Sequence, residues 1–466
     1  MHWGVVALSV LPAAAGLAAS PAHFQTVGLY VWKDSPELHA FWKACGINTL
    51  QFCDTHWSIR ADRLDDYYAR FAEGIASASR SGFRTDVILF SNIAQWTGPE
   101  EREPTGTGVL FDPRDANAFH ARMSSIARAV RALRQADGFT FIAGDPGGAV
   151  RAPFGPLAAD EWVAMAREVR KVVRHEAPRA RFSVNPWAIA YWQHPHLSCF
   201  TSTWWLREDL LARGILDAPD LIGPDCGVQL PAHTHYRPLA LRVLAGESAH
   251  SSDRSDKSER SNLLFPDASD VRRLRQRGTA RTWAWPYFLL DEADDADVGP
   301  GGVLKPSVQI NTRYIHRFVL QMRRIGVNGI IGNWSYAGHL PKAVNTFSFG
   351  RFCRDPRATP ERAIDEYARL LADEASWREL AQVLRFVEGL SNWERKLPPE
   401  HRLTPLPCRL LTASEALAAL AHVTPRASSR FPFQEPPERF LQRVEERLRA
   451  ELPPNEDRRG DPGGDR

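Results

Sequence analysis

The sequence lacks the short motifs that assign many proteins to a class at once. Its six cysteines form no C-x-x-C pair, so a zinc ribbon or a dithiol redox site is not expected. No G-x-G-x-x-G follows the first expected strand, and no G-x-x-x-x-G-K-[ST] occurs in the chain. Both absences argue against a nucleotide-binding loop. We therefore expect a protein that works without a bound cofactor.

The sequence also has little net charge and no long apolar run after its first residues. A formal charge of +3 over 466 residues gives no electrostatic reason to expect nucleic acid or a membrane surface as partner. No later stretch is apolar enough to span a bilayer, so no integral membrane segment is expected. Residues 1–22 contain a short apolar run and small residues, as a signal peptide does, but no preceding Lys or Arg. Two interpretations stay open: secretion or export to the periplasm, and a cytoplasmic protein with a disordered, Ala-rich arm.

Tryptophan is abundant instead. The chain has 15 Trp, while its apolar fraction of 44% and charged fraction of 24% are ordinary. The large flat indole ring suits stacking on the apolar face of a sugar. Core packing is the alternative role for any single Trp, because aromatic side chains mostly lie in protein interiors.

Strand-like and helix-like segments alternate along the chain from Thr26. Eight strands are expected, at Thr26–Trp32, Asn48–Cys53, Thr85–Ser91, Phe139–Ala143, Arg181–Val184, Asp220–Ile222, Ala280–Trp285 and Gly329–Gly332. The helices between them include Arg63–Ser81, Asp115–Ala136, Ala159–His175, Ser269–Arg277 and Ile310–Ile325. Strands separated by helices predict parallel βαβ units. Eight units predict an α/β fold, a closed (β/α)8 TIM barrel, with an open doubly wound sheet as the second choice.

The expected organisation has four parts. After the N-terminal arm, residues 23–345 form the barrel and residues 346–450 form a helical extension, with helices at Thr359–Asp373, Glu379–Trp393 and Ala413–His422. Residues 451–466 are polar and rich in Gly and Pro, which is typical of a disordered tail. The polar, mixed-charge stretch 249–262 is expected to be an insertion between the sixth and seventh strands.

Carboxylates that follow expected strands are the candidates for catalysis, because the active sites of barrels lie at the C-terminal ends of the strands. Asp145 stands in Gly144-Asp-Pro-Gly-Gly148 after the fourth strand, and Asp225 stands in Gly223-Pro-Asp-Cys-Gly227 after the sixth. Glycosidic cleavage uses two carboxyl groups, and we assign Asp145 as general acid and Asp225 as its partner. Both could instead be turn residues. Asp291 and Glu292 belong to an acidic loop, which is more typical of a solvated surface.

Further polar and aromatic residues follow the same strands and predict an oligosaccharide or polysaccharide as substrate. Asp54 is a candidate ligand for a substrate hydroxyl, as are Asn92, Asn185, Asn333 and Tyr336. The candidates for stacking on sugar rings are Trp32, Trp187, Trp283, Trp285 and Trp334.

The sequence resembles the superfamily of TIM-barrel glycoside hydrolases, with α-glucuronidase-like and hexosaminidase-like members as the nearer likeness, in a poorly characterised bacterial branch. Two segments carry the resemblance. One is the fourth strand with Gly144-Asp-Pro-Gly-Gly148. The other is Asn345–Glu361 followed by Ile364–Tyr367, which resembles the helix that follows the barrel. The chain departs from the hexosaminidase-like pattern, since no adjacent acidic pair follows the fourth strand, and no glutamate matches the acid of an α-glucuronidase.

Three functions are compatible with these patterns. The first is hydrolysis of a glycosidic bond by carboxylate acid/base catalysis. The second, suggested by the missing acidic pair, is a catalytically inactive barrel that binds carbohydrate. The third is a metal-dependent hydrolase that uses the pairs His194-Pro-His196 and His233-Thr-His235. We expect no metal site, because the usual H-x-H of such barrels lies on the first strand, and this first strand has none.

Overall fold

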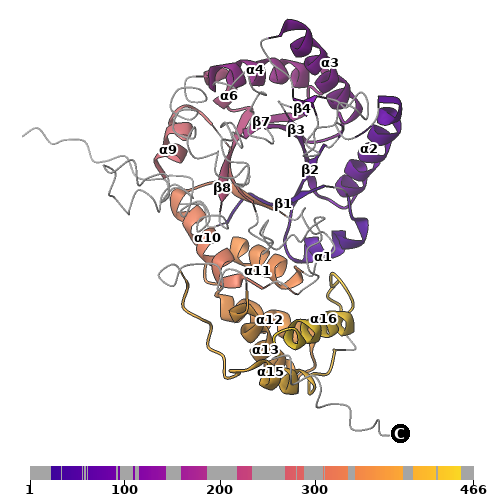
Figure 1. Ribbon diagram of the computed structural model, residues 1–466. Coiled ribbons are helices and arrows are strands. Elements are labelled where there is room, and N and C mark those ends of the chain that lie inside the picture. The colour runs from indigo at the N-terminus through magenta and orange to yellow at the C-terminus, as the bar shows by residue number, and fades with distance from the viewer. Residues whose placement is uncertain are drawn as a thin grey trace, which may run out of the picture.

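The computed structural model describes residues 23–32, 34–54, 56, 59, 61–90, 93–94, 109–110, 115–142, 159–185, 218–233, 268–279, 281–287, 308, 310–333, 342–391, 402–426 and 429–452. Eight of its strands are parallel and close into a barrel in the order β1-β10-β9-β8-β7-β6-β3-β2 (Figure 1). Their bounds are Thr26–Val31 (β1), Thr49–Cys53 (β2), Arg84–Phe90 (β3), Gly138–Ile142 (β6), Arg181–Asn185 (β7), Cys226–His233 (β8), Arg281–Tyr287 (β9) and Gly329–Asn333 (β10). The predicted closed barrel is confirmed.

The barrel closes where its first strand pairs with its last. Thr26 of β1 lies opposite Gly329 of β10, and Tyr30 lies opposite Asn333. A small antiparallel pair, β4 (Ile93–Ala94) and β5 (Val109–Leu110), lies in the connection that follows β3. Because all eight barrel strands run in the same direction, their C-terminal ends meet at one rim, which we call the C-terminal end of the barrel. The opposite rim is the N-terminal end.

Helices surround the strands on the outside of the barrel (Figure 1). They are η1 (Pro36–Leu38), α1 (His39–Ala44), η3 (Ala61–Arg63), α2 (Leu64–Arg80), α3 (Ala116–Ala132), α4 (Ala159–Glu176), α6 (Pro219–Ile222), α9 (Ala268–Gln276), α10 (Thr312–Ile325) and α11 (Ala343–Arg354). Capping residues fix the ends of two of these helices. Asp115 caps α3 by accepting hydrogen bonds from two backbone amides, and α10 ends at Gly326, whose φ of 85° suits glycine.

The main core lies between the strands and these helices. Val27, Leu29 and Val31, at alternate positions of β1, belong to it, as does Phe52 of β2. Alternation along a strand sends these side chains outward to the helices and sends the residues between them into the barrel. The interior of the barrel is therefore a separate layer of packing.

One expected strand is wrong. Residues 220–222 belong to the short helix α6, and the sixth barrel strand is β8, which begins only at Cys226. Pro219 begins the helix at a position where its missing N–H costs nothing. The actual strand contains Gly227 and Pro231, and both residues weaken a strand pattern in a sequence.

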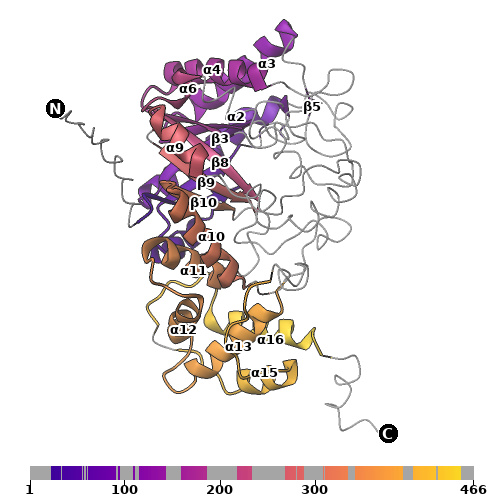
Figure 2. The same ribbon diagram turned by 90° about the vertical axis from the view of Figure 1, so that its left-hand side faces the viewer.

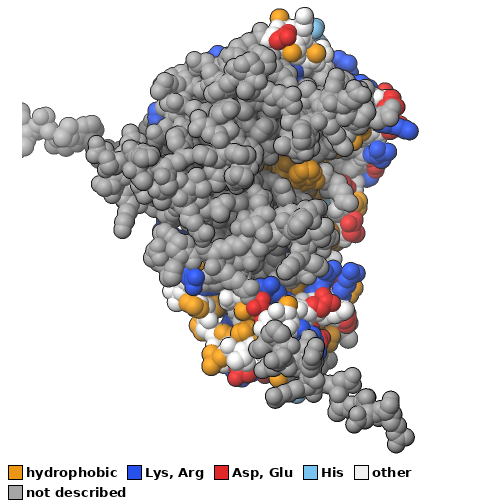
Figure 3. All heavy atoms as spheres, viewed as in Figure 1, with side chains coloured by type: hydrophobic (Ala, Val, Ile, Leu, Met, Phe, Trp, Pro, Cys, Tyr) orange, Lys and Arg blue, Asp and Glu red, His pale blue; other side chains and the backbone are white. Residues whose placement is uncertain are grey.

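The helical extension comprises α12 (Pro360–Leu371), α13 (Trp377–Gly389), α15 (Ala413–Leu420) and α16 (Pro437–Arg449). It lies beside the barrel, next to α10 and α11 (Figures 1 and 2). The expected boundary between residues 345 and 346 falls inside α11, the helix that follows the eighth barrel strand. In Figure 3, the described surface of this region shows acidic and basic side chains interspersed.

A buried ion pair joins the extension to the barrel. Nε of Arg313 on α10 lies 3.2 Å from Oε1 of Glu388 on α13, and both side chains are almost fully buried. Thr312 donates to Oε2 of Glu388 at 2.7 Å. Burial raises the pKa of Glu388, while Arg313 opposes that shift. Breaking a buried pair of this kind is strongly destabilising, so barrel and extension form one packed unit.

Backbone contact is close on the same side of the barrel. A Cβ atom on Gly350 of α11 would overlap the carbonyl oxygen of Cys45, which follows α1. Glycine thus lets the last barrel helix touch the first.

The described cysteines are all free thiols. Among the described helices, none has the length and apolar character needed to cross a bilayer.

Candidate active site at the C-terminal end of the barrel

Aromatic side chains mark the described part of the C-terminal end. Trp32 follows β1 directly and is 45% exposed. Tyr30, two residues earlier in β1, packs edge-on against Trp285 of β9, with ring centroids 5.4 Å apart. Trp285 is only 2% exposed. Trp32 thus presents an accessible ring, while Tyr30 and Trp285 form an aromatic floor.

The interior of the barrel is filled in three layers, each contributed by alternate strands. The layer at the C-terminal end contains Tyr30, Ile88, Asn185 and Trp285, the middle layer contains Gln51, Thr140, Gln229 and Ile331, and the layer at the N-terminal end contains Gly28, Asp86, Ser183 and Trp283. Branched apolar residues usually dominate such layers. Here most members are polar or aromatic, and several are joined by hydrogen bonds.

Asn185, the last residue of β7, is fully buried at the floor of this end. Its Nδ2 donates to Oε1 of Gln229 at 3.1 Å. The indole N–H of Trp285 donates to Oε1 of Gln51 at 2.8 Å. Both predicted site residues are therefore held from below by amides of the middle layer.

Asp86 carries a buried carboxyl group at the base of these contacts. Its Oδ2 accepts from Nε2 of Gln51 at 2.7 Å and from Oγ1 of Thr140 at 2.6 Å. Burial raises the pKa of Asp86 to about 6, although the two hydrogen bonds and the charge of Arg281 oppose the shift. Most copies of this carboxyl group are therefore ionised at neutral pH.

Asp54 lies at the end of β2, where it is 1% exposed. Its carboxylate accepts from the backbone and Nδ1 of His56, at 3.0 and 2.7 Å, and from the hydroxyl of Tyr67 at 3.0 Å. Nε2 of His56 lies 3.1 Å from Nη1 of Arg122. Burial lowers the pKa of Arg122 to about 10, partly offset by Asp54. This cluster ties β2 to α2 and α3, and we leave Asp54 out of the substrate contacts.

Asp225 lies at the wrong end of the barrel for catalysis with Asp145. It directly precedes β8, so it belongs to the N-terminal end, where its side chain is 77% exposed and lies 3.5 Å from Arg174. The misplaced sixth strand explains the error, because Asp225 was expected to follow a strand.

Trp283 also belongs to the N-terminal end. It lies in the layer of Asp86, close to Gly227 and Gly329, and its ring lies 5.8 Å from the guanidinium carbon of Arg281. Trp285, two residues further along β9, reaches the C-terminal end. Stacking on substrate is thus excluded for Trp283 by its position.

Several predicted site residues lie outside the described residues: Asn92, Asp145, Trp187, Trp334 and Tyr336. Asn333 is the last residue of β10, but nothing is described of its side chain. His194, His196 and His235 of the H-x-H pairs also lie outside, while His233 ends β8. Among the described residues, no three His, Cys, Asp or Glu side chains lie close enough to hold a metal ion.

Sequence reasoning missed the polar residues of the middle layer. A signal for them exists, because Gln51, Thr140 and Gln229 are each flanked on both sides by large apolar residues of one strand. On an ordinary half-exposed sheet this pattern puts the polar residue in water. In a barrel it puts the residue inside.

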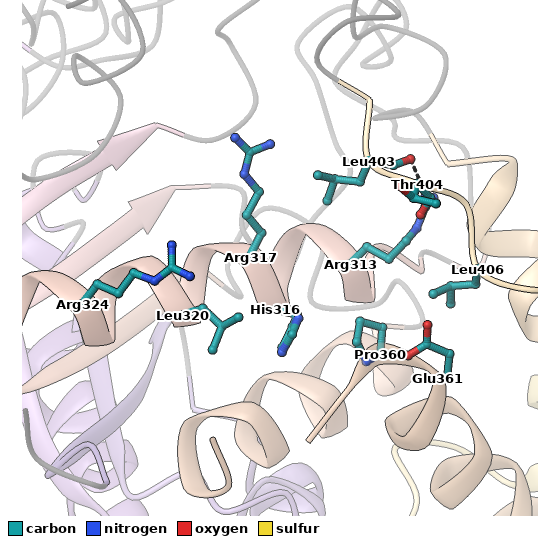
Figure 4. Close-up of a pocket in the computed structure, with 10 residues that line it drawn as sticks. All are labelled: Arg313, His316, Arg317, Leu320, Arg324, Pro360, Glu361, Leu403, Thr404 and Leu406. Carbon is teal, nitrogen blue, oxygen red and sulfur yellow. Dashed lines mark hydrogen bonds between the residues drawn. The ribbon is translucent and has the colours of Figure 1, made fainter. Parts of the chain in front are cut away.

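A separate pocket lies outside the barrel, between α10, α12 and residues 403–406 (Figure 4). Its volume is about 330 Å³, and Arg317, Arg324 and Glu361 are among its lining residues. Barrel enzymes place catalysis at the C-terminal ends of the strands, so this pocket is not the candidate site.

Comparisons with known proteins identify the fold. No protein-family model and no curated protein sequence matches the chain. A family GH115 4-O-methyl-α-glucuronidase with specificity for decorated arabinogalactans is similar in structure, with a TM-score of 0.51 and 10% identity over 92% of this chain. The chain spans about half of that enzyme, 54% of its length.

Two further solved structures are similar at lower TM-scores. A mutant O-GlcNAc hydrolase of Thermobaculum terrenum has a TM-score of 0.47 and 11% identity, with 92% of this chain and 75% of that chain covered. Dispersin B has a TM-score of 0.36 and 12% identity, with 71% and 97% covered. At these identities the likeness concerns the fold. The chain has a (β/α)8 barrel with a helical extension, the fold that it shares with the family GH115 glucuronidase.

Proposed function

We propose that the protein is a glycoside hydrolase that cleaves a glycosidic bond at the C-terminal end of its barrel. The observation that carries the proposal is the group of aromatic residues at this end: Trp32, which follows β1, is 45% exposed, and the buried residues Tyr30, Trp285 and Asn185 form the floor. An accessible indole and amide groups at the same end of a barrel suit a sugar, which offers an apolar ring face and hydroxyl groups. The similar fold of a glucuronidase supports the same class of reaction.

The catalytic carboxylates follow from the strand ends that the structure defines. Within five residues of the end of a barrel strand, the sequence has the acids Asp34, Asp54, Asp145, Asp291 and Glu292. Oδ1 of Asp34 is engaged by His39 at 2.7 Å, and Asp54 is engaged by His56 and Tyr67. We therefore assign Asp145 as the general acid and place its partner among Asp291 and Glu292. These two acids take the role first assigned to Asp225.

The remaining substrate contacts come from the predicted residues. Trp32 stacks on a sugar ring, and the segments that follow β3, β7 and β10 supply Asn92, Trp187, Trp334 and Tyr336. Asn185 and Asn333 end their strands at this rim. Trp285, which is buried, supports the floor and does not stack on the sugar.

The test is the turnover of aryl and alkyl glycosides by Asp145→Asn. Loss of a general acid should lower kcat roughly a hundredfold to ten-thousandfold for a substrate with a poor leaving group. A dinitrophenyl glycoside should suffer much less, because its leaving group needs no proton. Asp291→Asn and Glu292→Gln identify the partner by the same assay.

Asp225→Asn is the matched control, since the same change is made at the N-terminal end. It should keep the wild-type rate. An Asp145→Asn variant that is folded and fully active on every substrate would remove Asp145 from the mechanism. Binding of oligosaccharides on a glycan array without any turnover would favour the inactive, sugar-binding barrel. Loss of activity in chelator would favour a metal-dependent hydrolase.

A further inference from the structure

Two chains of hydrogen-bonded side chains run through the barrel and meet at Asp86. In the first, Trp285 donates to Gln51, and Gln51 donates to Oδ2 of Asp86. In the second, Asn185 donates to Gln229, Gln229 donates to Oγ1 of Thr140 at 3.1 Å, and Thr140 donates to the same oxygen of Asp86. The six residues come from six strands and cross all three layers.

The direction of every hydrogen bond in these chains follows from chemistry. An indole N–H only donates, and an ionised carboxylate only accepts. Gln51 must therefore turn its carbonyl oxygen to Trp285 and its amide nitrogen to Asp86. In the other chain, Thr140 donates its proton to Asp86, so its oxygen accepts from Gln229 at 3.1 Å and, at the longer distance of 3.4 Å, from Gln51. The orientation of the Asn185 amide is thus set by a carboxyl group three hydrogen bonds away.

The N-terminal end of the barrel is shaped to hold this carboxyl group. A Cβ atom on Gly138 would stand 2.7 Å from Oδ1 of Asp86, so glycine leaves the space that the carboxyl group occupies. A cavity of about 40 Å³ lies beside it, lined by residues that include Asp137, Arg181 and Trp283. That volume has room for roughly two or three water molecules. The carboxyl group is thus fixed from above by side chains and has polar surroundings below.

We propose that Asp86 is a positioning residue for the active site, which acts through Gln51 and Thr140 to fix Trp285 and the amide of Asn185 at the floor of the C-terminal end. The part of this inference that concerns catalysis rests on the proposed function. The direction of the hydrogen bonds does not depend on it. A positioning role is physically sound because a shift of about 1 Å in a group that orients a substrate lowers rates by roughly a hundredfold.

The test compares three replacements in the full-length chain. Asp86→Asn keeps an oxygen acceptor at the place of Oδ2 but removes the charge. Asp86→Leu has a similar size and no acceptor. Thr140→Val has the same shape as threonine and breaks the Asn185 chain. The Trp285 chain loses only the long 3.4 Å contact between Gln51 and Thr140 and keeps the 2.7 Å hydrogen bond from Gln51 to Asp86. Asp137→Asn is the matched control, because Asp137 bonds to Thr85 and stands outside both chains.

Two readouts are needed. One is the indole N–H resonance of Trp285 in protein labelled with ¹⁵N-tryptophan, assigned by its disappearance in Trp285→Phe. The other is kcat and KM for the aryl glycoside that the wild type cleaves fastest. This resonance shows whether the hydrogen bond from Trp285 to Gln51 is intact, whether or not the protein is an enzyme.

The expected pattern separates positioning from simple stability. Asp86→Asn should keep the Trp285 resonance and most of kcat, whereas Asp86→Leu should move the resonance and lower kcat roughly tenfold to a hundredfold with a smaller change in KM. Thr140→Val should lower kcat and leave the resonance in place. Asp137→Asn should match the wild type in both.

Three outcomes would overturn the inference. A folded Asp86→Leu with an unmoved resonance would show that Gln51 keeps its orientation without the carboxylate. An Asp86→Asn variant as damaged as Asp86→Leu would show that charge matters and the acceptor does not. If Asp86→Leu does not fold, an unchanged kcat in Thr140→Val would decide against the proposal. If the wild type cleaves no glycoside, the proposed function fails while the resonance still tests the chains.

Discussion

The two ends of the barrel interior are built from similar residues and differ in what those residues touch. Trp283 and Trp285 lie two positions apart on β9 and both face inward. Trp283 packs at the N-terminal end against Gly227 and Gly329, while Trp285 reaches the C-terminal end and donates its N–H to Gln51. The N-terminal end packs one large ring against glycines, beside the small cavity that adjoins Asp86. The C-terminal end places its polar groups in fixed directions.

The comparison extends to the carboxyl groups. Asp225 at the N-terminal end is exposed and pairs with Arg174, and an exposed pair contributes little to stability. Asp86 is buried, and its hydrogen bonds lead toward the C-terminal end. Position along the strand thus decides whether an acidic residue is a surface group or part of a network. Changes at residues of the N-terminal end that stand outside the two hydrogen-bonded chains, such as Trp283 and Gly227, should alter stability alone. Changes at Asp86 or at the C-terminal end should alter function.

The largest expected contrast is between two tryptophans. Trp283→Ala should lower the free energy of unfolding by about 3 kcal/mol, because the partly buried ring loses its contacts with Gly227 and Gly329 and the cavity beside it grows, and should keep KM unchanged. Trp32→Ala removes an exposed ring, so stability should change little while KM for the best aryl glycoside rises about tenfold. Urea denaturation and steady-state kinetics measure the two quantities. Equal effects of both variants on KM would erase the distinction between the ends.

The second contrast concerns pH. The folded-state pKa of Asp86 is about 6, above its usual value of 3.8, so its contribution to stability is fully present below about pH 4 and is lost as the pH rises through 6. Relative to Asp86→Asn, which does not titrate, the wild type should lose about 3 kcal/mol between these limits. Urea unfolding of both proteins from pH 4 to 7 gives the difference. The trend should persist in Asp137→Asn, where Asp86 remains, and a constant difference between wild type and Asp86→Asn would contradict the assigned burial.

The smallest contrast concerns glycines. A Cβ atom on Gly227 would stand 2.7 Å from Oγ of Ser183 and 3.0 Å from the ring of Trp283. Gly227→Ala should therefore cost about 1–3 kcal/mol of stability through overpacking, with kcat unchanged. Gly389→Ala is the control, because nothing lies within 4 Å of its Cβ position and alanine favours a helix. A fall in kcat for fully folded Gly227→Ala would mean that residues of the N-terminal end outside the two hydrogen-bonded chains also affect catalysis.

Much of the fold could be predicted from the sequence because its local signals agree. Strands such as β1 and β2 are short apolar runs followed by helices with a clear apolar face, and that order implies a barrel. The sixth strand failed for a local reason. Gly227 and Pro231 weaken the strand pattern of β8, whereas the apolar residues Leu221 and Ile222 of a one-turn helix resemble a short strand. That single error moved Asp225 from one end of the barrel to the other.

The site was harder to predict, because its supports are defined by closure of the sheet. The pattern Phe139-Thr140-Phe141 looks like a strand with one face in water. A parallel sheet covered by helices buries both of its faces. Closure into a barrel then brings Gln51 of β2 against Trp285 of β9, although the two strands are not neighbours. Asn185 and Trp32 could be predicted from strand ends, since that rule needs the order of the strands and no knowledge of the interior. The assignment of Asp145 as a catalytic residue also depends on this rule of strand ends.

The ion pair between Arg313 and Glu388 limits how this chain can be shortened. Truncation after the eighth barrel helix would remove Glu388 and leave the guanidinium of Arg313 without its anion, together with two backbone carbonyls, of Leu403 and Thr404, that it also binds. Truncation at that point would expose the guanidinium to water and would uncover the apolar surface of α10 and α11 on which the extension packs. The smallest part of the chain that folds therefore includes the extension. A related barrel without the extension must cover α10 and bind the residue at the position of Arg313 with other groups.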